Sequence, residues 1–304
     1  MASQRDVKQR IDSVKNIRKI TRAMEMVAAA RLRRAEQRIA HLRPYAGAIR
    51  RMTRQAAEAA GGEVGKLPIL QQHENEQTIA VLLVTADRGL AGAFNSQILR
   101  AGTRAATDYE GEGRDVVFYA SGRRGVSSLT FRGREVVGSY TGFTERPAYS
   151  DARNIAADLI AAYVDGDVDR VEIFYNHYIS PLQQRVTRET LLPLQQATIL
   201  GEDEDAEAEE GERGEGHHRA LVEYEPEPAE ILERLVPSYV EISIFRALLE
   251  STASEHGARM TAMRNASDNA GELIETLTLQ MNRARQAEIT QEILEVVGGA
   301  EALG

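Results

Sequence analysis

Apolar residues recur every three or four positions along the first sixty residues, the spacing that gathers them on one face of an α-helix. This pattern predicts a helix from about Ser3 to Ala60, which Gly61 and Gly62 end and which Pro44 kinks or locally opens. The expected seam consists of Val7, Ile11, Val14, Ile17, Ile20, Met24, Ala28, Leu32, Ala35, Ile39, Leu42, Ala46 and Ile49. A helix of this length outruns any single core that the chain could build, which argues against a surface helix of a globular domain.

The C-terminal part of the chain repeats the pattern. We expect a helix that begins near Pro228, with a candidate break at Pro237, and that runs from Val240 to about Val297, before Gly298. Its expected seam consists of Met263, Ala266, Ala270, Leu273, Leu277, Gln280, Ala284, Ala287, Gln291 and Leu294. Neither terminal helix has enough apolar surface to fold alone, so we expect the two to pair as a long antiparallel coiled coil. Such a pair is typical of a lever or a shaft.

Between the two helices, the spacing of apolar residues changes to one that is typical of β-strands. Strands are expected at residues 78–85, 115–120 and 170–179, with a short one around Val136. Helices are expected from the turn at 87–95 to about Tyr109, and over 150–164 with Ser150 as its cap. Residues 121–125 are expected to turn, and residues 184–192 alternate like an edge strand paired with the strand before them. This order predicts an α/β fold with a mostly parallel, Rossmann-like sheet.

The predicted domain organisation follows from these elements. Residues 1–60 form the N-terminal coiled-coil helix, 61–200 the Rossmann-like α/β domain, 201–220 an acidic flexible insertion, and 221–304 the C-terminal coiled-coil helix.

Charge is distributed unevenly along the chain. The net charge is -9, yet residues 1–54 hold fifteen Lys and Arg against four Asp and Glu. A basic rod on an acidic body implies a partner that is organised electrostatically around the rod. Residues 201–216 hold nine Asp and Glu, which predicts a self-repelling loop. We favour a passive, solvated insertion, and the alternative is a regulatory brake that acts on basic patches of a partner.

Candidate chemistry is sparse. The chain has no cysteine, which excludes disulfide partners, thiolate metal sites and thiol nucleophiles. The six histidines are scattered and fit no metal or nucleophile–base motif, His177 is expected to be structural, and so we expect no catalytic residue, metal or cofactor. The turn Asp87–Asn95 follows a strand and opens a helix, where an anion could bind, but its spacing is that of neither a dinucleotide fingerprint nor a P-loop. We therefore expect a tight structural turn, in which Asp87 pairs with Arg88.

Binding of nucleic acid is also disfavoured. Arg31, Arg33, Arg34 and Arg38 cluster on the first helix, but the chain is acidic overall and no aromatic residues lie between them for stacking. No apolar run is long enough to span a membrane, and the first residues lack the apolar region of a secretory signal. Two other classes remain as alternatives to a mechanical part. They are a nucleotide-binding enzyme that uses the α/β unit, and a free-standing coiled-coil adaptor.

Three segments together resemble one family closely. They are Lys19–Ala35 (KITRAMEMVAAARLRRA), Asp87–Asn95 (DRGLAGAFN), and Arg259–Ala270 (RMTAMRNASDNA) continuing to Arg285–Ile293 (RQAEITQEI). In this order, and with Tyr224-Glu225-Pro226 before the last helix, they resemble the γ subunit of bacterial F-type ATP synthases over nearly the whole chain. The acidic residues at 201–216 are not part of the family pattern, and Ala91 and Ala93 stand where cysteine or glycine is common.

The resemblance implies a function as well as a fold. A γ subunit is the non-catalytic rotor shaft of the central stalk, with its coiled coil inside the ring of α and β subunits. Its α/β domain lies against the ε subunit and the c-ring. Proton flow turns the c-ring and the shaft, which couples rotation to ATP synthesis or hydrolysis by shifting the affinities of the β subunits. The resemblance therefore implies a peripheral protein at the cytoplasmic face of the plasma membrane, with α, β, ε and the c-ring as partners.

Residue roles carry over by position. The resemblance implies that Arg285, Gln286 and Thr290 contact the β subunits as a catch near the top of the shaft. It implies that Met24, Arg31, Arg33 and Arg34 face the acidic lever segments of β, and that Tyr224 and Glu225 face the c-ring. For each residue the alternative is that it only packs in the coiled coil.

Overall fold

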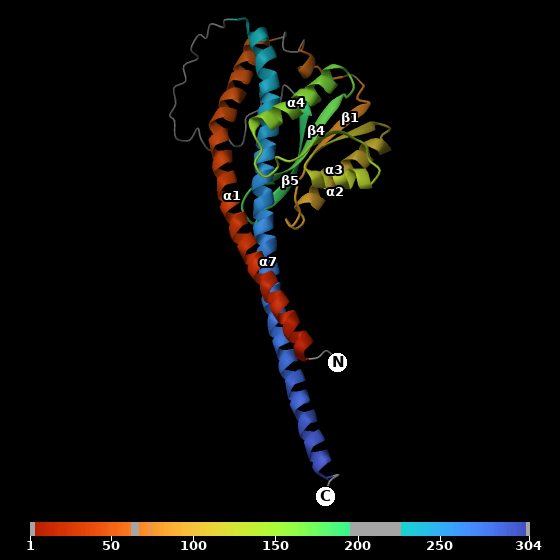
Figure 1. Cartoon of the computed structure of the whole chain (residues 1–304). Coiled ribbons are helices and arrows are strands. Elements are labelled where there is room, and N and C mark those ends of the chain that lie inside the picture. Colours follow the sequence, from red (N-terminus) through yellow and green to blue (C-terminus); the bar gives the residue numbers. More distant parts are fainter. Residues whose placement is uncertain (1–3, 62–66, 74, 195–225, 302–304) are drawn as a thin grey trace. The chain divides into compact units, whose positions relative to one another are not determined.

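A computed structural model describes residues 4–61, 67–73, 75–194 and 226–301 (Figure 1). The expected acidic insertion, Tyr224 and Glu225 lie outside the described residues. The chain divides into two compact units, one of residues 1–31 with 259–304 and the other of residues 32–258. We call them the coil unit and the sheet unit.

Two long helices supply residues to both units. Helix α1 is Gln4–Ala60 and helix α7 is Pro228–Glu301, so both expected terminal helices are present. Pro44 lies inside α1 without ending it, and the expected ends at Pro237 and Gly298 are wrong, since α7 continues through both. Val236 and Val240 on either side of Pro237 are almost fully buried. Packing of these neighbours outweighs the loss of one backbone hydrogen bond at the proline.

The sheet unit is built on five strands. They are β1 (Thr78–Val84), β2 (Asp115–Ser121), β3 (Val136–Tyr140), β4 (Arg170–Tyr178) and β5 (Gln184–Leu192). Their order is β3-β2-β1-β4-β5, in which β1 to β4 are parallel and β5 pairs antiparallel with β4. The mostly parallel sheet with an antiparallel edge is therefore confirmed. A short 3-10 helix, η2 (Pro68–Leu70), precedes β1.

Three helices connect the parallel strands. They are α2 (Phe94–Gly111), α3 (Arg123–Phe131) and α4 (Tyr149–Val164). Helix α3 was missed by the sequence prediction, which expected only a turn at residues 121–125. Ser150 lies inside α4 and not at its cap; there the Asp151 carboxylate accepts a 2.7 Å hydrogen bond from the Ala148 amide.

Alternate residues of β1 enter two different cores. Ala80, Leu82 and Val84 pack with α4 and with the buried face of α7 around Ile244 and Leu248. Ile79, Val81 and Leu83 pack with α2 and α3 on the opposite face. A Cβ on Gly102 of α2 would lie 2.2 Å from a Leu83 methyl, so glycine is required for α2 to approach the sheet this closely. Both faces of the sheet are covered, as expected for strands that are apolar on both sides.

A third core joins the two long helices within the sheet unit. Ala56 and Ala57 of α1 pack with Leu232 and Val236 of α7 and with Leu194, which follows β5. The small alanines allow the two helices to approach closely at this point.

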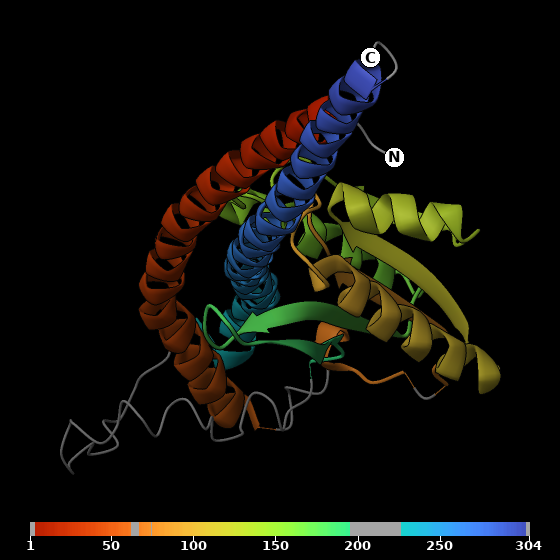
Figure 2. The same cartoon turned by 90° about the horizontal axis from the view of Figure 1, so that it is seen from below.

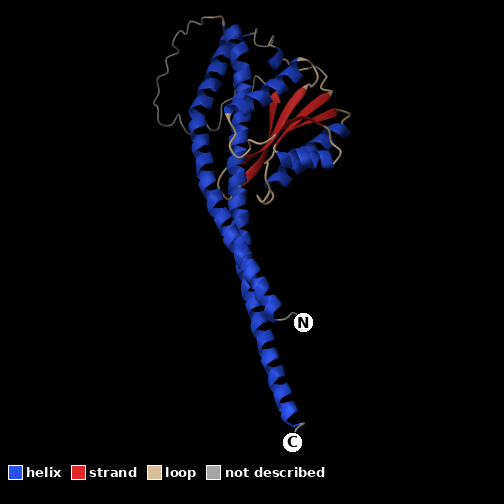
Figure 3. Ribbon diagram, viewed as in Figure 1, coloured by secondary structure: helices blue, strands red, loops and turns tan. Residues whose placement is uncertain are grey.

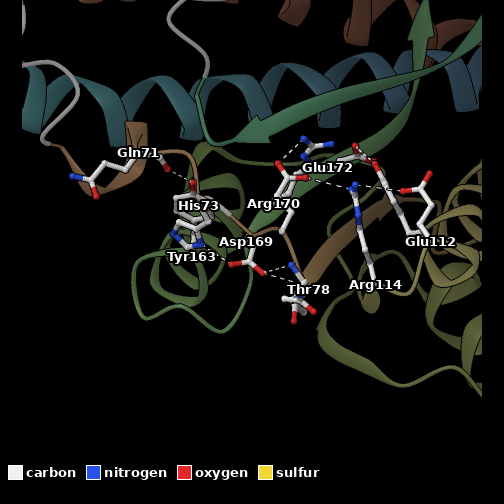
Figure 4. A network of polar contacts seen from close by, with 12 residues as sticks. Gln71, His73, Thr78, Glu112, Arg114, Tyr163, Asp169, Arg170 and Glu172 are labelled. Carbon is white, nitrogen blue, oxygen red and sulfur yellow. Dashed lines mark hydrogen bonds and ion pairs between the residues drawn. The ribbon is translucent and has the colours of Figure 1, made fainter.

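Polar contacts fix the segment that leads into β1 (Figure 4). The Asp169 carboxylate accepts hydrogen bonds of 2.8 Å from the amides of residues 77 and 78 and lies 2.6 Å from Nδ1 of His73. Burial opposes its charge, but these hydrogen bonds outweigh burial and hold the pKa of Asp169 below its usual value. The His73 ring stacks on the Tyr163 ring, with the ring centroids 4.7 Å apart.

A second part of the network crosses the sheet beside it. Glu172 of β4 is 1% exposed, and its carboxylate accepts hydrogen bonds from Arg188 of β5 (2.7 Å) and from the Tyr109 hydroxyl of α2 (2.6 Å). Burial and the Glu172 charge raise the pKa of Tyr109, which therefore stays protonated. A buried carboxylate is tolerated here because both of its partners are positioned.

Ionic contacts also hold α7 on the hairpin of β4 and β5. His177 Nδ1 lies 2.5 Å from the Glu250 carboxylate, and Arg246 lies 2.7 Å from Glu189. The hydrogen bond to Glu250 raises the pKa of His177, although burial and the charges of Arg185 and Arg246 oppose it. The expectation of a structural histidine at this position agrees with these contacts.

The His177→Gln variant should change how stability depends on pH. A histidine whose pKa rises on folding stabilises the fold fully below its unfolded pKa of about 6.5, and this contribution disappears as pH rises through the folded pKa. We expect the urea midpoint of the parent chain, relative to that of the variant, to fall between pH 6 and pH 8. His41→Gln, which changes an exposed histidine of α1, is the matched control and should follow the parent curve. Parallel curves for parent and His177→Gln would contradict this role.

Candidate subunit interfaces

The turn Asp87–Asn95 is a structural junction in which the Asp87 carboxylate is fully engaged. It accepts hydrogen bonds from the amides of Arg123 (3.1 Å) and Gly142 (2.9 Å) and from the Thr144 hydroxyl (3.0 Å). The Asp87 amide in turn donates to the Thr144 hydroxyl at 2.9 Å. One carboxylate thus ties together the segments that follow β1, β2 and β3, and it leaves no cradle for a phosphate at this position.

The expected pairing of Asp87 with Arg88 is wrong. Arg88 pairs with Glu145 at 3.3 Å, and the arginine nearest Asp87 is Arg123, at 3.8 Å. Adjacent side chains in a turn point apart, so the loops that meet Asp87 from other strands provide its partners.

The coil unit pairs the start of α1 with α7, and the two helices lie side by side there in both views (Figures 1 and 2). Val7, Ile11 and Val14 of α1 pack with Ala270 and Leu277 of α7. Between Val14 and Ala35 the next buried positions of α1 are Thr21, Ala28, Leu32 and Ala35 itself. The expected seam through Ile17 and Ile20 is wrong, because these side chains are 53% and 59% exposed.

The seam of α1 is a regular heptad with polar members. Arg18 and Glu25 occupy its positions between Val14, Thr21 and Ala28. The guanidinium carbon of Arg18 lies 3.5 Å from where a Cβ of Gly271 would be, and Glu25 lies 2.9 Å from Arg264 Nε of α7. The sequence prediction considered apolar residues alone and therefore left the heptad register after Val14. Val7, Thr21 and Ala35 are separated by multiples of seven residues and show that the register continues.

The seam of α7 departs from its prediction in the same way. Met263, Ala270 and Leu277 are buried as expected, but the residues packed between and after them are Ser267, Ile274 and Met281. Leu273 is 44% exposed and Gln280 is exposed, so the expected positions there are wrong. Beyond Met281 the expected seam residues Ala287, Gln291 and Leu294 are exposed.

An apolar row lies beside the seam of α1. Ile17, Ile20, Met24 and Val27 follow one another at helical spacing, one residue before successive seam positions and therefore about 100° around the helix. Met24 is half-buried and the other three are exposed. We call these four residues the α1 row. A contiguous exposed apolar row of this kind is a candidate interaction surface.

The C-terminal part of α7 carries two further rows. Figure 3 shows α7 continuing beyond the first residues of α1. Arg285 begins a row with Ile289, Ile293 and Val296, and Gln286 begins the adjacent row with Thr290, Leu294 and Val297. All eight side chains are exposed, and the Thr290 hydroxyl donates to the Gln286 carbonyl at 2.8 Å. We call this segment the α7 tip.

The expected contact residues therefore lie on different surfaces of the chain. Arg285, Gln286 and Thr290 are on the α7 tip, and Met24 is in the α1 row. Arg31 is half-buried, while Arg33 and Arg34 of the sheet unit are exposed. For the three residues of the α7 tip, exposure argues against the alternative that they only pack in the coiled coil.

Comparisons with known proteins point to the family that the sequence resembles. A family model described as ATP synthase matches residues 3–303. A protein of Rubrobacter xylanophilus named ATP synthase gamma chain is 44% identical over 305 residues, covering 100% of this chain and 99% of the relative. The chain belongs to the ATP synthase gamma chain family. A Streptomyces coelicolor gamma chain is 45% identical over 306 residues, covering 99% of this chain and 96% of that one.

Solved structures share the fold. The central stalk and c-ring structure of Tetrahymena thermophila mitochondrial ATP synthase contains a chain with a TM-score of 0.58 and 27% identity. The match covers 82% of this chain and 99% of that one. A chain of the Euglena gracilis mitochondrial enzyme has a TM-score of 0.65 over 99% of this chain and 94% of its own, at 19% identity. As a gamma chain, the protein is a non-catalytic subunit of the central stalk, and the family and function expected from the sequence are confirmed.

Among the described residues, no group of three or more His, Asp and Glu side chains could hold a metal ion. No helix in this part of the chain is both long and apolar enough to cross a membrane.

The corrected seam of α7 predicts which leucines stabilise the coil unit. Leu277→Ala should destabilise it by about 2–3 kcal/mol, because Leu277 is 5% exposed and its removal leaves a cavity against α1. Leu273→Ala, the matched control on the preceding turn, should cost less than about 1 kcal/mol. Hydrogen exchange of the amides of residues 4–31 measures the difference. Equal protection losses in the two variants would favour the original seam.

Proposed function

We propose that the chain is the rotor shaft of an F-type ATP synthase and transmits torque between a proton-driven c-ring and a ring of α and β subunits. Its partners are the α, β and ε subunits and the c-ring, and it works at the cytoplasmic face of the plasma membrane. Membership of the gamma chain family supports this function. The observation that carries the proposal is the α7 tip, where residues 282–297 include five exposed large apolar side chains.

The α7 tip fits a sleeve of other subunits. Exposed isoleucine, leucine and valine on two adjacent rows would favour association in water, so a partner that surrounds the helix would remove them from solvent. Apolar contacts are non-directional, so their free energy changes little as a shaft rotates, and no single orientation traps it. Arg285 and Gln286 begin the two rows and add directional hydrogen bonds at one level. They are the proposed catch on the β subunits, together with Thr290.

The α1 row provides a second contact on the same shaft. Met24 lies in it, and the proposed lever contact combines this apolar surface with the positive charges of Arg31, Arg33 and Arg34. Acidic segments of β would be attracted to this charge, and the apolar row would fix the contact at short range. Because the two surfaces lie on different helices and are not equivalent, the shaft is asymmetric, and each orientation favours a different state of each β subunit.

Reconstitution tests the proposal directly. Purified α and β subunits should assemble and sustain ATP hydrolysis when this chain is added, and should show little steady turnover without it. If the chain neither binds them nor changes turnover, the rotor function is wrong.

The catch is tested by Arg285→Ala/Gln286→Ala in the same complex. We expect ATP hydrolysis to fall about tenfold, because two charged or polar contacts to β are lost while the coil unit is unaffected. Asn282→Ala/Arg283→Ala removes the same two side-chain types from the preceding turn and is the matched control, with less than a twofold effect expected. Equal losses in both double variants would assign the effect to helix charge and not to a catch.

A further inference from the structure

Four arginines line an open hollow on the face of the sheet that α2 and α3 cover. It has a volume of about 400 Å³ and lies where α2 meets the turn between α3 and β3. Its lining consists of Arg100, Thr103, Arg104, Thr107, Arg132 and Arg134. Figure 1 shows α2 and α3 side by side on one face of the sheet. We call this hollow the arginine pocket.

Local structure brings these residues together from two elements. One face of α2 carries four of the lining residues, at the helical spacing i, i+3, i+4 and i+7: Arg100, Thr103, Arg104 and Thr107. Arg132 and Arg134 lie on either side of Gly133, which takes a φ of +71° and turns the chain from α3 toward β3. The two arginines after α3 therefore meet the two on α2.

The charge of the pocket is poorly compensated. The described residues that line it include no carboxylate, and the nearest acidic contact is the bidentate pair of Glu110 with Arg134. That guanidinium also lies 5.9 Å from the centre of the Phe118 ring, so it is held in place. Arg104 and Arg132 have no acidic partner within the described part of the chain. Within the described residues, only Nε of the Arg100 guanidinium makes a hydrogen bond, which it donates to the Ser96 carbonyl at 3.2 Å.

Like charges that line one hollow repel one another, and an anion placed among them would relieve the repulsion. We propose that the arginine pocket binds an oxyanion of the phosphate class that carries at least two negative charges. Planar guanidinium groups offer paired donors that match phosphate oxygens, and three of the four retain unused donors. This site goes beyond the rotor function and does not depend on it.

The lining also limits the ligand. It contains only arginine and threonine, so it offers no apolar or aromatic wall for a nucleobase or an acyl chain. The Thr107 hydroxyl donates to the Thr103 carbonyl at 3.0 Å, which leaves the arginines as the donors to the ligand. The pocket therefore recognises a phosphate group by its charge, and that group could belong to a free polyphosphate or to a lipid headgroup.

Titration calorimetry of the full chain with inorganic pyrophosphate tests the site. We expect saturable binding of one pyrophosphate per chain, which Arg104→Gln and Arg132→Gln each weaken about tenfold. Arg153→Gln is the matched control, because it removes the same charge from an exposed position of α4 on the opposite face of the sheet. Circular dichroism checks that all variants are folded. If Arg153→Gln weakens pyrophosphate binding as much as the pocket variants do, the binding reflects general charge attraction, and the proposal is wrong.

Vesicles separate the two possible sources of phosphate. Cosedimentation of the chain with vesicles that contain anionic phospholipid, lost in Arg104→Gln and Arg132→Gln but kept in Arg153→Gln, would assign the site to a headgroup. Pyrophosphate binding without such cosedimentation would assign it to a soluble phosphate. If neither probe depends on Arg104 and Arg132, the pocket is no oxyanion site.

Discussion

Burial of one stretch of α7 on every side is the constraint on which the sheet unit depends. Residues 247–257 are all buried, although Glu250, Ser251, Thr252 and Ser254 are among them. Each of these four polar groups has a partner on the sheet or its loops. Thr252 donates to the Thr144 carbonyl, Ser254 donates to the Asn176 carbonyl, Ser251 accepts from the Asn176 amide, and His177 contacts Glu250. An unmatched group at such a position would cost about 1–3 kcal/mol, so these partners permit only one axial position and rotation of the helix. Apolar packing alone would tolerate a slip of one turn far better.

The two units use different means to hold α7. In the sheet unit it is fixed by directional hydrogen bonds and by close contacts such as Gly257, where a Cβ would lie 3.0 Å from the Pro181 carbonyl. In the coil unit it meets α1 along a seam that mixes small, apolar and charged residues. Polar seam residues specify register at the expense of stability, and the pair of Glu25 with Arg264 fits that role. A shaft needs fixed register more than a deep core, because a slipped register would change which surface meets its partners.

The sequence predicted the architecture well wherever one period dominates. The strongly apolar strand at residues 78–85 and the alternating strand at 184–192 appear as expected, and both long helices have nearly their predicted starts. Helix α3 was missed because Gly122 and Gly125 suggest a turn, whereas Gly122 in fact precedes the helix with a φ of +92°. Its Cβ would collide with the Thr85 carbonyl 2.2 Å away, so the glycine records a close approach of two chain segments that a local pattern cannot reveal.

The candidate interfaces were harder to predict from the pattern, for a related reason. An apolar residue on a long helix can face its own partner helix or point away from it. The sequence prediction placed Ile17 and Ile20 in the seam, whereas both side chains are exposed. The regular spacing of Val14, Thr21 and Ala28 resolves the choice only if threonine is accepted as a seam residue. In the sheet unit, Asp87 and Asp169 accept hydrogen bonds from backbone amides and so serve the structure. Within the described part of the chain, the long helices expose apolar rows, and three arginines of one pocket keep unused donors. Surfaces of this kind act by binding.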